Sequence, residues 1–162
     1  MTTTITGATG VNQITDDAIT AAKLPAGSVL QVVHAVSPSS NVTFSTSTYT
    51  DIDLSASITP ISTSSKILVS WSVQGKLGEV DGGWGTKLLR GSTSVYQSAT
   101  SYDIYINQEP SMRVRSGYTH IDSPSSTSAI VYKVQVSSFL NKTVYINADG
   151  NKCFITLMEI AG

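Results

Sequence analysis

Residues 153–162, CFITLMEIAG, are the most apolar strand candidate in the chain, and they decide its fold class. Residues 129–136, AIVYKVQV, have the same character. Val, Ile and Tyr fit the pleated surface of a sheet, and stiff β-branched side chains disfavour helix. The two segments predict an all-β protein in which the C-terminal strand lies in the core.

Working outward from these segments, apolar runs or alternating patterns recur between turn signals. We expect about eight to ten short strands at regular spacing with no interleaved helices, which is typical of a β-sandwich or jelly roll. We expect 142–147 to pair with the C-terminal strand across the turn signal at 147–151, and we expect 97–117 to form a long loop with weak strand character. The expected strands are 28–36, two short pieces within 42–53, 54–59, 66–74, 86–90, 118–122, 129–136, 142–147 and the C-terminal segment.

Composition limits the classes of function. A chain of 162 residues with 40% hydrophobic residues can bury one core, which we assign to a head domain at 27–162. The net charge of -1 and the charged fraction of 13% argue against a nucleic-acid partner or an anionic membrane. The N-terminus lacks the pattern of a signal peptide, and no apolar run reaches the roughly 18 residues of a membrane span. We expect synthesis in a cytoplasm and no membrane insertion.

The N-terminal segment at 1–26 has too few large apolar side chains to make a core of its own. A short helix is expected within 16–24, capped by Asp16 or Asp17 and ended by Pro25 and Gly27. An isolated helix of this length is marginal in water, so its order requires a docking partner. We therefore predict that this segment is an anchor, held through Ile5, Val11, Ile14, Ile19 and Leu24.

Catalysis is not expected, and no catalytic residue is assigned. The sequence contains no Gly-x-Ser-x-Gly nucleophile elbow, while His34 lies within an apolar strand and His120 lies beside a turn. The single cysteine, Cys153, excludes an intrachain disulfide and is expected to be a small buried apolar residue.

No metal site or cofactor is expected either. The spacing of His34, His120, Asp122 and Cys153 matches no standard zinc pattern. Two alternatives remain open at this point. One histidine per chain could bind a metal or an anion on a three-fold axis, and the two carboxylates of 51–53 could hold calcium or act as edge charges that prevent wrong strand pairing.

The ordered segments 27–33, 58–60 with 64–69, 122–132 and 155–160 resemble the C-terminal head domains of bacteriophage fibre and virion structural proteins. Residues 14–24 are similar to a segment found in tail-fibre stalks, and the likeness covers most of 10–162. The resemblance implies a jelly roll of the tumour-necrosis-factor and complement C1q type, which usually forms homotrimers. It also implies a short fibre or knob on a virion, anchored to other virion proteins through 1–26.

Two alternative functions are kept beside this one. A capsid decoration or head-fibre protein would use the same head to stabilise or coat the capsid surface. A free carbohydrate-binding module would need a preformed pocket.

A trimer requires apolar side chains on its axis. We predict a subunit interface that includes the C-terminal strand and is lined by Tyr132, Tyr145, Phe154, Leu157 and Ile160.

The resemblance also implies contact with a host-surface glycan or receptor. Trp84, with glycine on either side, is a candidate for stacking on sugar rings. The further candidates in the irregular stretch and beside it are Tyr96, Tyr102, Tyr105, Arg113 and Arg115, since Tyr and Arg are frequent at binding hot spots. The alternative for all of these residues is packing between subunits or at the end of the sandwich.

Overall fold

Alternation along the strands produces two layers of β-sheet. In β3 (Thr50–Ile58) the side chains of Leu54, Ala56 and Ile58 are buried, while Ser55 and Ser57 between them are exposed. Successive side chains on a strand point to opposite faces, so this pattern places one face on a core and the other in water. The computed structural model describes residues 20, 23–38, 42–99, 102–108 and 111–162.

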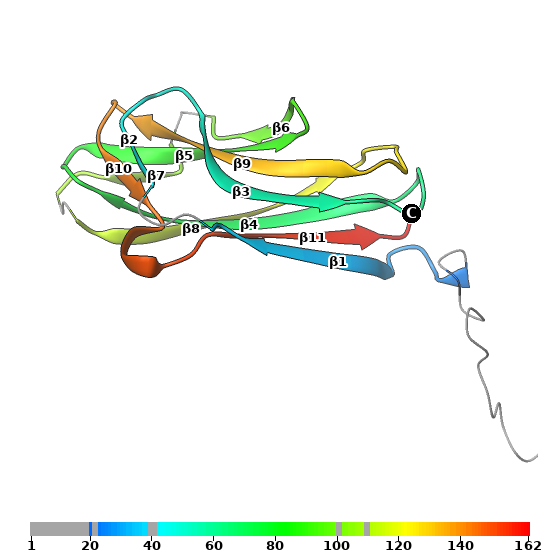
Figure 1. Ribbon diagram of the computed structural model, residues 1–162. Helices are drawn as coiled ribbons and strands as arrows, with labels where there is room; N and C mark the ends of the chain where they lie inside the picture. The colour runs from blue at the N-terminus through cyan, green and yellow to red at the C-terminus, as the bar shows by residue number, and fades with distance from the viewer. Residues whose placement is uncertain (1–19, 21–22, 39–41, 100–101, 109–110) are drawn as a thin grey trace, which may run out of the picture.

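The first sheet, sheet A, contains six strands (Figure 1). Its long strands follow the order β1, β11, β4, β8, and the short strands β10 and β2 continue the sheet beside the last part of β4. Their bounds are β1 (Val29–Val36), β11 (Phe154–Ile160), β4 (Lys66–Leu77), β8 (Arg113–Asp122), β10 (Val144–Ile146) and β2 (Val42–Phe44).

The second sheet, sheet B, contains five strands. Its order is β3, β9, β5, β6, with β7 paired to the first part of β5. Their bounds are β9 (Ile130–Phe139), β5 (Gly82–Arg90), β6 (Thr93–Gln97) and β7 (Ile104–Ile106), and a 3-10 turn, η2 (Ala148–Gly150), precedes β11.

The connectivity of the eight long strands confirms the jelly roll predicted from the sequence. In chain order these strands are β1, β3, β4, β5, β6, β8, β9 and β11. Sheet A then contains the first, eighth, third and sixth of them, and sheet B the second, seventh, fourth and fifth. This order is the double Greek key of a jelly-roll sandwich.

The core lies between the two sheets. Trp71 of β4, Trp84 of β5 and Tyr132 of β9 are its largest side chains, and each is at most 1% exposed. From β11 the side chains of Ile155 and Leu157 enter the same core. The expectation that the C-terminal strand lies in the core is therefore confirmed.

Two expectations about the strands are wrong. The strand β10 pairs with β4 and β2, and not with the C-terminal strand. The reason is the length of β4: β11 pairs with its residues 66–72, which leaves 75–77 for β10. In addition, the stretch 97–117 contains β7 and the first half of β8, so it is more regular than its polar sequence indicates.

The two ends of the sandwich differ. Residues 23–28 approach β1 at the end where the C-terminus lies (Figure 1). The backbone N–H of Gly27 donates to the carbonyl of Ala161 at 2.8 Å, and the N–H of Ala161 donates to Ser28 at 2.8 Å. We call this end, with residues 59–65 and 161–162, the terminal end. The opposite end, formed by 78–82, 104–108, 111–112 and 139–144, is the far end.

The predicted helix at 16–24 lies mostly outside the described residues. Within the described part of the chain, no helix is long and apolar enough to span a membrane.

Candidate functional site

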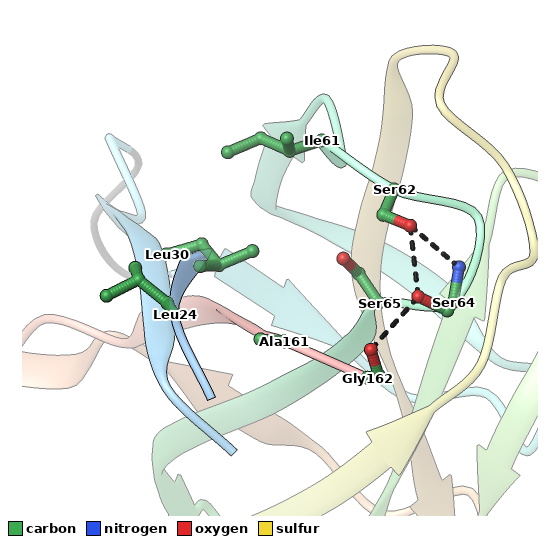
Figure 2. Close-up of a pocket in the computed structure, with 8 residues that line it drawn as sticks. All are labelled: Leu24, Leu30, Ile61, Ser62, Ser64, Ser65, Ala161 and Gly162. Atoms are coloured by element: carbon green, nitrogen blue, oxygen red, sulfur yellow. Dashed lines mark hydrogen bonds between the residues drawn. The ribbon is translucent and has the colours of Figure 1, made fainter. Parts of the chain in front are cut away.

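A pocket opens at the terminal end, between the approach to β1 and the connection from β3 to β4 (Figure 2). Its volume is about 420 Å³. Leu24 and Ile61 are 37% and 54% exposed at this pocket, and the hydroxyl of Ser64 donates to the carbonyl of Gly162 at 3.2 Å. The lining residues are Leu24, Leu30, Ile61, Ser62, Ser64, Ser65, Ala161 and Gly162.

The connection from β3 to β4 is held in place by a buried carboxylate. Glu159 of β11 is 0% exposed and accepts hydrogen bonds from the Ile61 backbone N–H at 2.7 Å and from Gln31 Nε2 at 2.5 Å. Burial alone would raise the pKa of Glu159. The hydrogen bonds from Gln31 Nε2 and the Ile61 backbone N–H, together with the polar groups of Ser62 and Ser65 close by, outweigh burial, so the pKa lies below its ordinary value of 4.5. Glu159 is therefore an ionised structural group.

Of the predicted anchor residues, only Leu24 lies within the described part of the chain. It lines this pocket, so the last predicted anchor residue lies at the terminal end of the head. The other four, Ile5, Val11, Ile14 and Ile19, lie outside the described residues.

The predicted subunit interface is wrong at two positions. Tyr132 and Leu157 are both 0% exposed, because their positions in β9 and β11 face the core of their own chain. The other three predicted residues, Tyr145, Phe154 and Ile160, lie on the outer face of sheet A, where Phe154 is 36% exposed. The interface prediction thus included both faces of one strand.

The outer face of sheet A carries a set of apolar side chains that one polar row interrupts. Val32 of β1, Met158 of β11, Leu68 of β4 and Ile121 of β8 are successive partners across the sheet and form one row. We call the set formed by this row and its apolar neighbours the apolar face; it contains Val29, Val32, Val36, Leu68, Ile121, Phe154, Met158 and Ile160.

Polar groups on this face are mainly hydroxyls. In the row next to Val32, His34 Nδ1 lies 2.9 Å from the hydroxyl of Thr156, and Thr119 donates to Ser70 at 3.5 Å. Hydroxyls that already share hydrogen bonds are cheaper to cover with protein than charges are. Sequence reasoning missed this face because its residues come from four separate strands.

Trp84 is not a host-contact residue. It is 0% exposed, so its indole cannot contact a ligand outside the protein. Glycines around it allow close packing: Gly83 beside it allows Ile104 of β7 to approach, and Gly75 of β4 lies against its ring. A Cβ on Gly75 of β4 would lie 2.8 Å from the Trp84 ring, and a Cβ on Gly83 would lie 1.9 Å from the Ile104 carbonyl oxygen.

The remaining host-contact candidates fall into three places. The ring of Tyr96 contacts Trp71 and Tyr118 inside the edge of the sandwich, with centroids 5.2 and 5.4 Å away. Tyr102 and Tyr105 lie together at the far end, and Arg113 and Arg115 lie on the outer face of sheet A. The structure does not bring the whole set together in one site.

The far end exposes an aromatic group on loops with a constrained backbone. The ring centroids of Tyr102 and Phe139 are 4.4 Å apart, and the hydroxyl of Tyr105 donates to Asp81 at 3.3 Å. Leu140 is 56% exposed and has a φ of 57°, a left-handed conformation that is uncommon outside glycine and asparagine. An exposed apolar side chain on such a backbone suggests a contact surface.

Residues considered for metal or acid–base chemistry are separated or already engaged. Asp122 accepts two hydrogen bonds from Arg90 Nη1 at 2.9 Å and one from the Tyr132 hydroxyl at 2.6 Å. Cys153 is 0% exposed, and burial raises the pKa of its thiol. Within the described residues, no three His, Cys, Asp or Glu side chains are placed to hold a metal ion.

Asp51 and Asp53 are both exposed on either side of the buried Ile52, and the ladder between β3 and β9 shifts register between Asp51 and Leu54. Asp51 is engaged by Lys133 at 2.8 Å and by Gln135 at 2.7 Å.

Comparison with known proteins shows a likeness of fold. No protein-family model matches the chain, and no curated protein sequence matches it. Among solved structures, VP2 in a subviral particle of infectious bursal disease virus matches with a TM-score of 0.50 and 10% identity, over 82% of this chain and 37% of that chain. The structure of the Gx strain of that virus matches with a TM-score of 0.53 and 10% identity, over 82% and 32%. This chain thus spans about a third of the length of those proteins.

Proposed function

We propose that this chain is a non-enzymatic structural protein of a virus particle, and that it acts as a short homotrimeric knob. The terminal end faces the particle, to which 1–26 attaches through other virion proteins, and the far end faces outward. The jelly roll is shared with a viral capsid protein, which supports a virion role. The bacteriophage assignment rests on the sequence resemblance.

The apolar face of sheet A carries the proposal. Twelve large hydrophobic residues are exposed in the described part of the chain, and five of them, Val29, Val32, Val36, Ile121 and Phe154, lie on this one face. Clustered exposed apolar residues indicate an interaction surface, whereas scattered ones do not.

The outer face of sheet B provides the contrast within the same molecule. It carries the basic side chains of Lys87 and Lys133 and the carboxylate of Asp51. Charges of this kind keep a sheet face in water. On sheet A the basic side chains of Lys76, Arg113 and Arg115 lie toward the far end, whereas the row of Val32, Met158, Leu68 and Ile121 carries no charge. This row and its apolar neighbours are therefore the part of the molecule that a second copy would cover.

The size of the apolar face suits assembly. Four strands at normal spacing and about eight residues of length give about 19 by 26 Å, or roughly 500 Å² of sheet surface, which includes the apolar side chains and the polar row between them. A standard interface buries about 800 Å² on each partner, so this part of sheet A supplies more than half of one. In a ring of three, each copy meets two neighbours, and the strand edges supply the remainder.

Host attachment is assigned to the far end. It lies at the end of the sandwich opposite residues 23–28 (Figure 1). It carries Tyr105 and Leu140, which are 47% and 56% exposed. Three copies of a weak contact on each knob, and many knobs on a particle, give avidity without a tight single site.

A capsid-surface protein is the second candidate, because the two solved structures described above are of virus particles. The same trimer would then lie over the capsid shell and stabilise it. The two candidates differ in the partner of 1–26, which cross-linking on intact particles would identify as a tail or a capsid protein.

Two measurements test the proposal. Light scattering of the purified chain should give a mass of about three times 17.1 kDa. On a density gradient, the chain should sediment with virus particles and be detected there by an antibody. A 17.1 kDa species at all concentrations would refute the trimer, and a chain that stays free of particles would refute the virion role.

A further inference from the structure

Three basic side chains lie on the outer face of sheet A, toward the far end. Lys76 of β4 is the direct cross-strand partner of Arg113 of β8, and Arg115 follows on the same face of β8. Arg115 Nη2 also donates to the backbone carbonyl of Lys152 at 3.1 Å, whereas the Lys152 ammonium donates to the Pro38 carbonyl at 3.2 Å. We call Lys76, Arg113 and Arg115 the basic cluster.

Two of these cations are positioned by contacts other than carboxylates. The guanidinium of Arg115 lies 5.7 Å from the centre of the Phe154 ring and donates to the Ser72 hydroxyl at 3.0 Å. The ammonium of Lys76 lies 5.6 Å from the centre of the Tyr145 ring. Aromatic rings and a hydroxyl orient a cation without neutralising it.

The charge balance of the basic cluster differs from that of other cations in the molecule. Arg90, Lys133 and Lys142 each form an ion pair with a carboxylate of their own. Within the described residues, the basic cluster forms one ion pair with a carboxylate, between Arg113 and Asp149. The hydrogen bond from Arg113 holds the pKa of Asp149 below its ordinary value, and the positive charge of Lys76 lowers it further.

Like charges directly opposite each other on a sheet are destabilising. Lys76 and Arg113 are such a pair, on a chain whose net charge is -1. A ligand that carries anionic groups would relieve this repulsion and gain charge-assisted hydrogen bonds from the two arginines.

We propose that the basic cluster is a binding site for an anionic polysaccharide that carries carboxylate or sulfate groups. The choice of a cell-surface glycan rests on the proposed role in host attachment, but the site is complete within one chain and needs no second copy.

Nucleic acid is the less favoured polyanion. Its affinity comes from many phosphate contacts along a basic track, and the basic cluster is confined to a few residues on neighbouring strands. Adjacent strands lie about 4.8 Å apart, so the cluster is as wide as a short stretch of sugar chain.

The test is binding of the full chain to immobilised heparin and to immobilised hyaluronate, at low and at physiological salt. The wild-type chain should bind at least one of them, more weakly as salt rises. Arg113→Gln should weaken binding about tenfold, and Asp149→Asn should strengthen it several-fold because it removes a carboxylate from the site. The matched control Lys133→Gln removes a cation from sheet B and should leave binding unchanged.

Three outcomes overturn the proposal: no binding to either glycan, equal loss in the Lys133→Gln control, or equal affinity for duplex DNA. Weakening by both Arg113→Gln and Asp149→Asn would indicate a structural effect and would also overturn it. Light scattering on the same samples separates this proposal from the proposed function. A trimer that binds no glycan refutes the site alone, whereas a monomer that binds glycan refutes the assembly alone.

Discussion

The substitution Val32→Asp tests the assembly face most directly. Val32 is 55% exposed in the centre of the apolar face, beside Met158. Burying a whole valine side chain is worth about 1.5–3 kcal/mol, so covering the exposed half gives about 1 kcal/mol per copy. An aspartate at this position loses that gain and adds a desolvation cost of several kcal/mol for each carboxylate. Three copies would together lose on the order of 10 kcal/mol, so a trimer should dissociate at micromolar concentration.

The control for this substitution is Val131→Asp. Val131 is 47% exposed on the outer face of sheet B, so both variants place the same charge at a similarly exposed valine in a strand. Light scattering over a range of concentrations should give about 17.1 kDa for Val32→Asp and the wild-type mass for Val131→Asp. Circular dichroism should show a folded β-protein in both cases. A Val32→Asp variant that is folded and has the wild-type trimer mass would refute the reasoning, as would equal dissociation of the control.

Three further predictions concern stability. Glu159→Gln should cost about 1–3 kcal/mol at pH 7, because an amide cannot accept all the hydrogen bonds that the buried carboxylate accepts. Because the pKa of Glu159 is lowered, its carboxylate stabilises the fold at pH values above the ordinary pKa of 4.5, and this stability is lost as the pH falls through the lowered pKa. In urea unfolding between pH 7 and pH 3, the variant should therefore lose less stability in acid than the wild type. The same pH profile for both proteins would contradict this. Asp122→Asn should lower the free energy of unfolding by about 3–5 kcal/mol, since it leaves Arg90 and the Tyr132 hydroxyl without their shared carboxylate. Asp51→Asn, at an exposed ion pair, should lower it by at most about 1 kcal/mol. Similar urea midpoints for the two variants would contradict this prediction. The thiol of Cys153 should react with a thiol reagent only in urea, because it is fully buried, and rapid reaction of the folded protein would contradict the burial.

Sequence periodicity located most of the strands. The segments predicted at 28–36, 66–74 and 129–136 correspond to β1 (Val29–Val36), β4 (Lys66–Leu77) and β9 (Ile130–Phe139). This worked because alternation and β-branched composition act within a few residues of chain, where the sequence is sufficient. Strand number and spacing predicted a sandwich or a jelly roll, and the family resemblance implied the jelly roll.

The choice of face could not be predicted for strands that are apolar on both sides. In β11 the inward residues Ile155 and Leu157 alternate with the outward residues Phe154, Met158 and Ile160. A period of two is invisible when both sets are hydrophobic, so Leu157 was wrongly placed on a subunit interface. Trp84 was misplaced for a related reason, since its flanking glycines are equally expected in an exposed loop and in a crowded strand.

The sequence by itself determined that this chain is an all-β protein with one core and a C-terminal core strand that carries apolar side chains on both faces, because these properties depend on local pattern and composition. Only the tertiary structure decided which side chains from different strands lie next to one another. Strand pairing brings Val32, Leu68, Ile121 and Met158 from four strands into one apolar row, and it brings Lys76 opposite Arg113. These residues are distant in the chain, and their contact depends on a hydrogen-bonded register that no local stretch encodes.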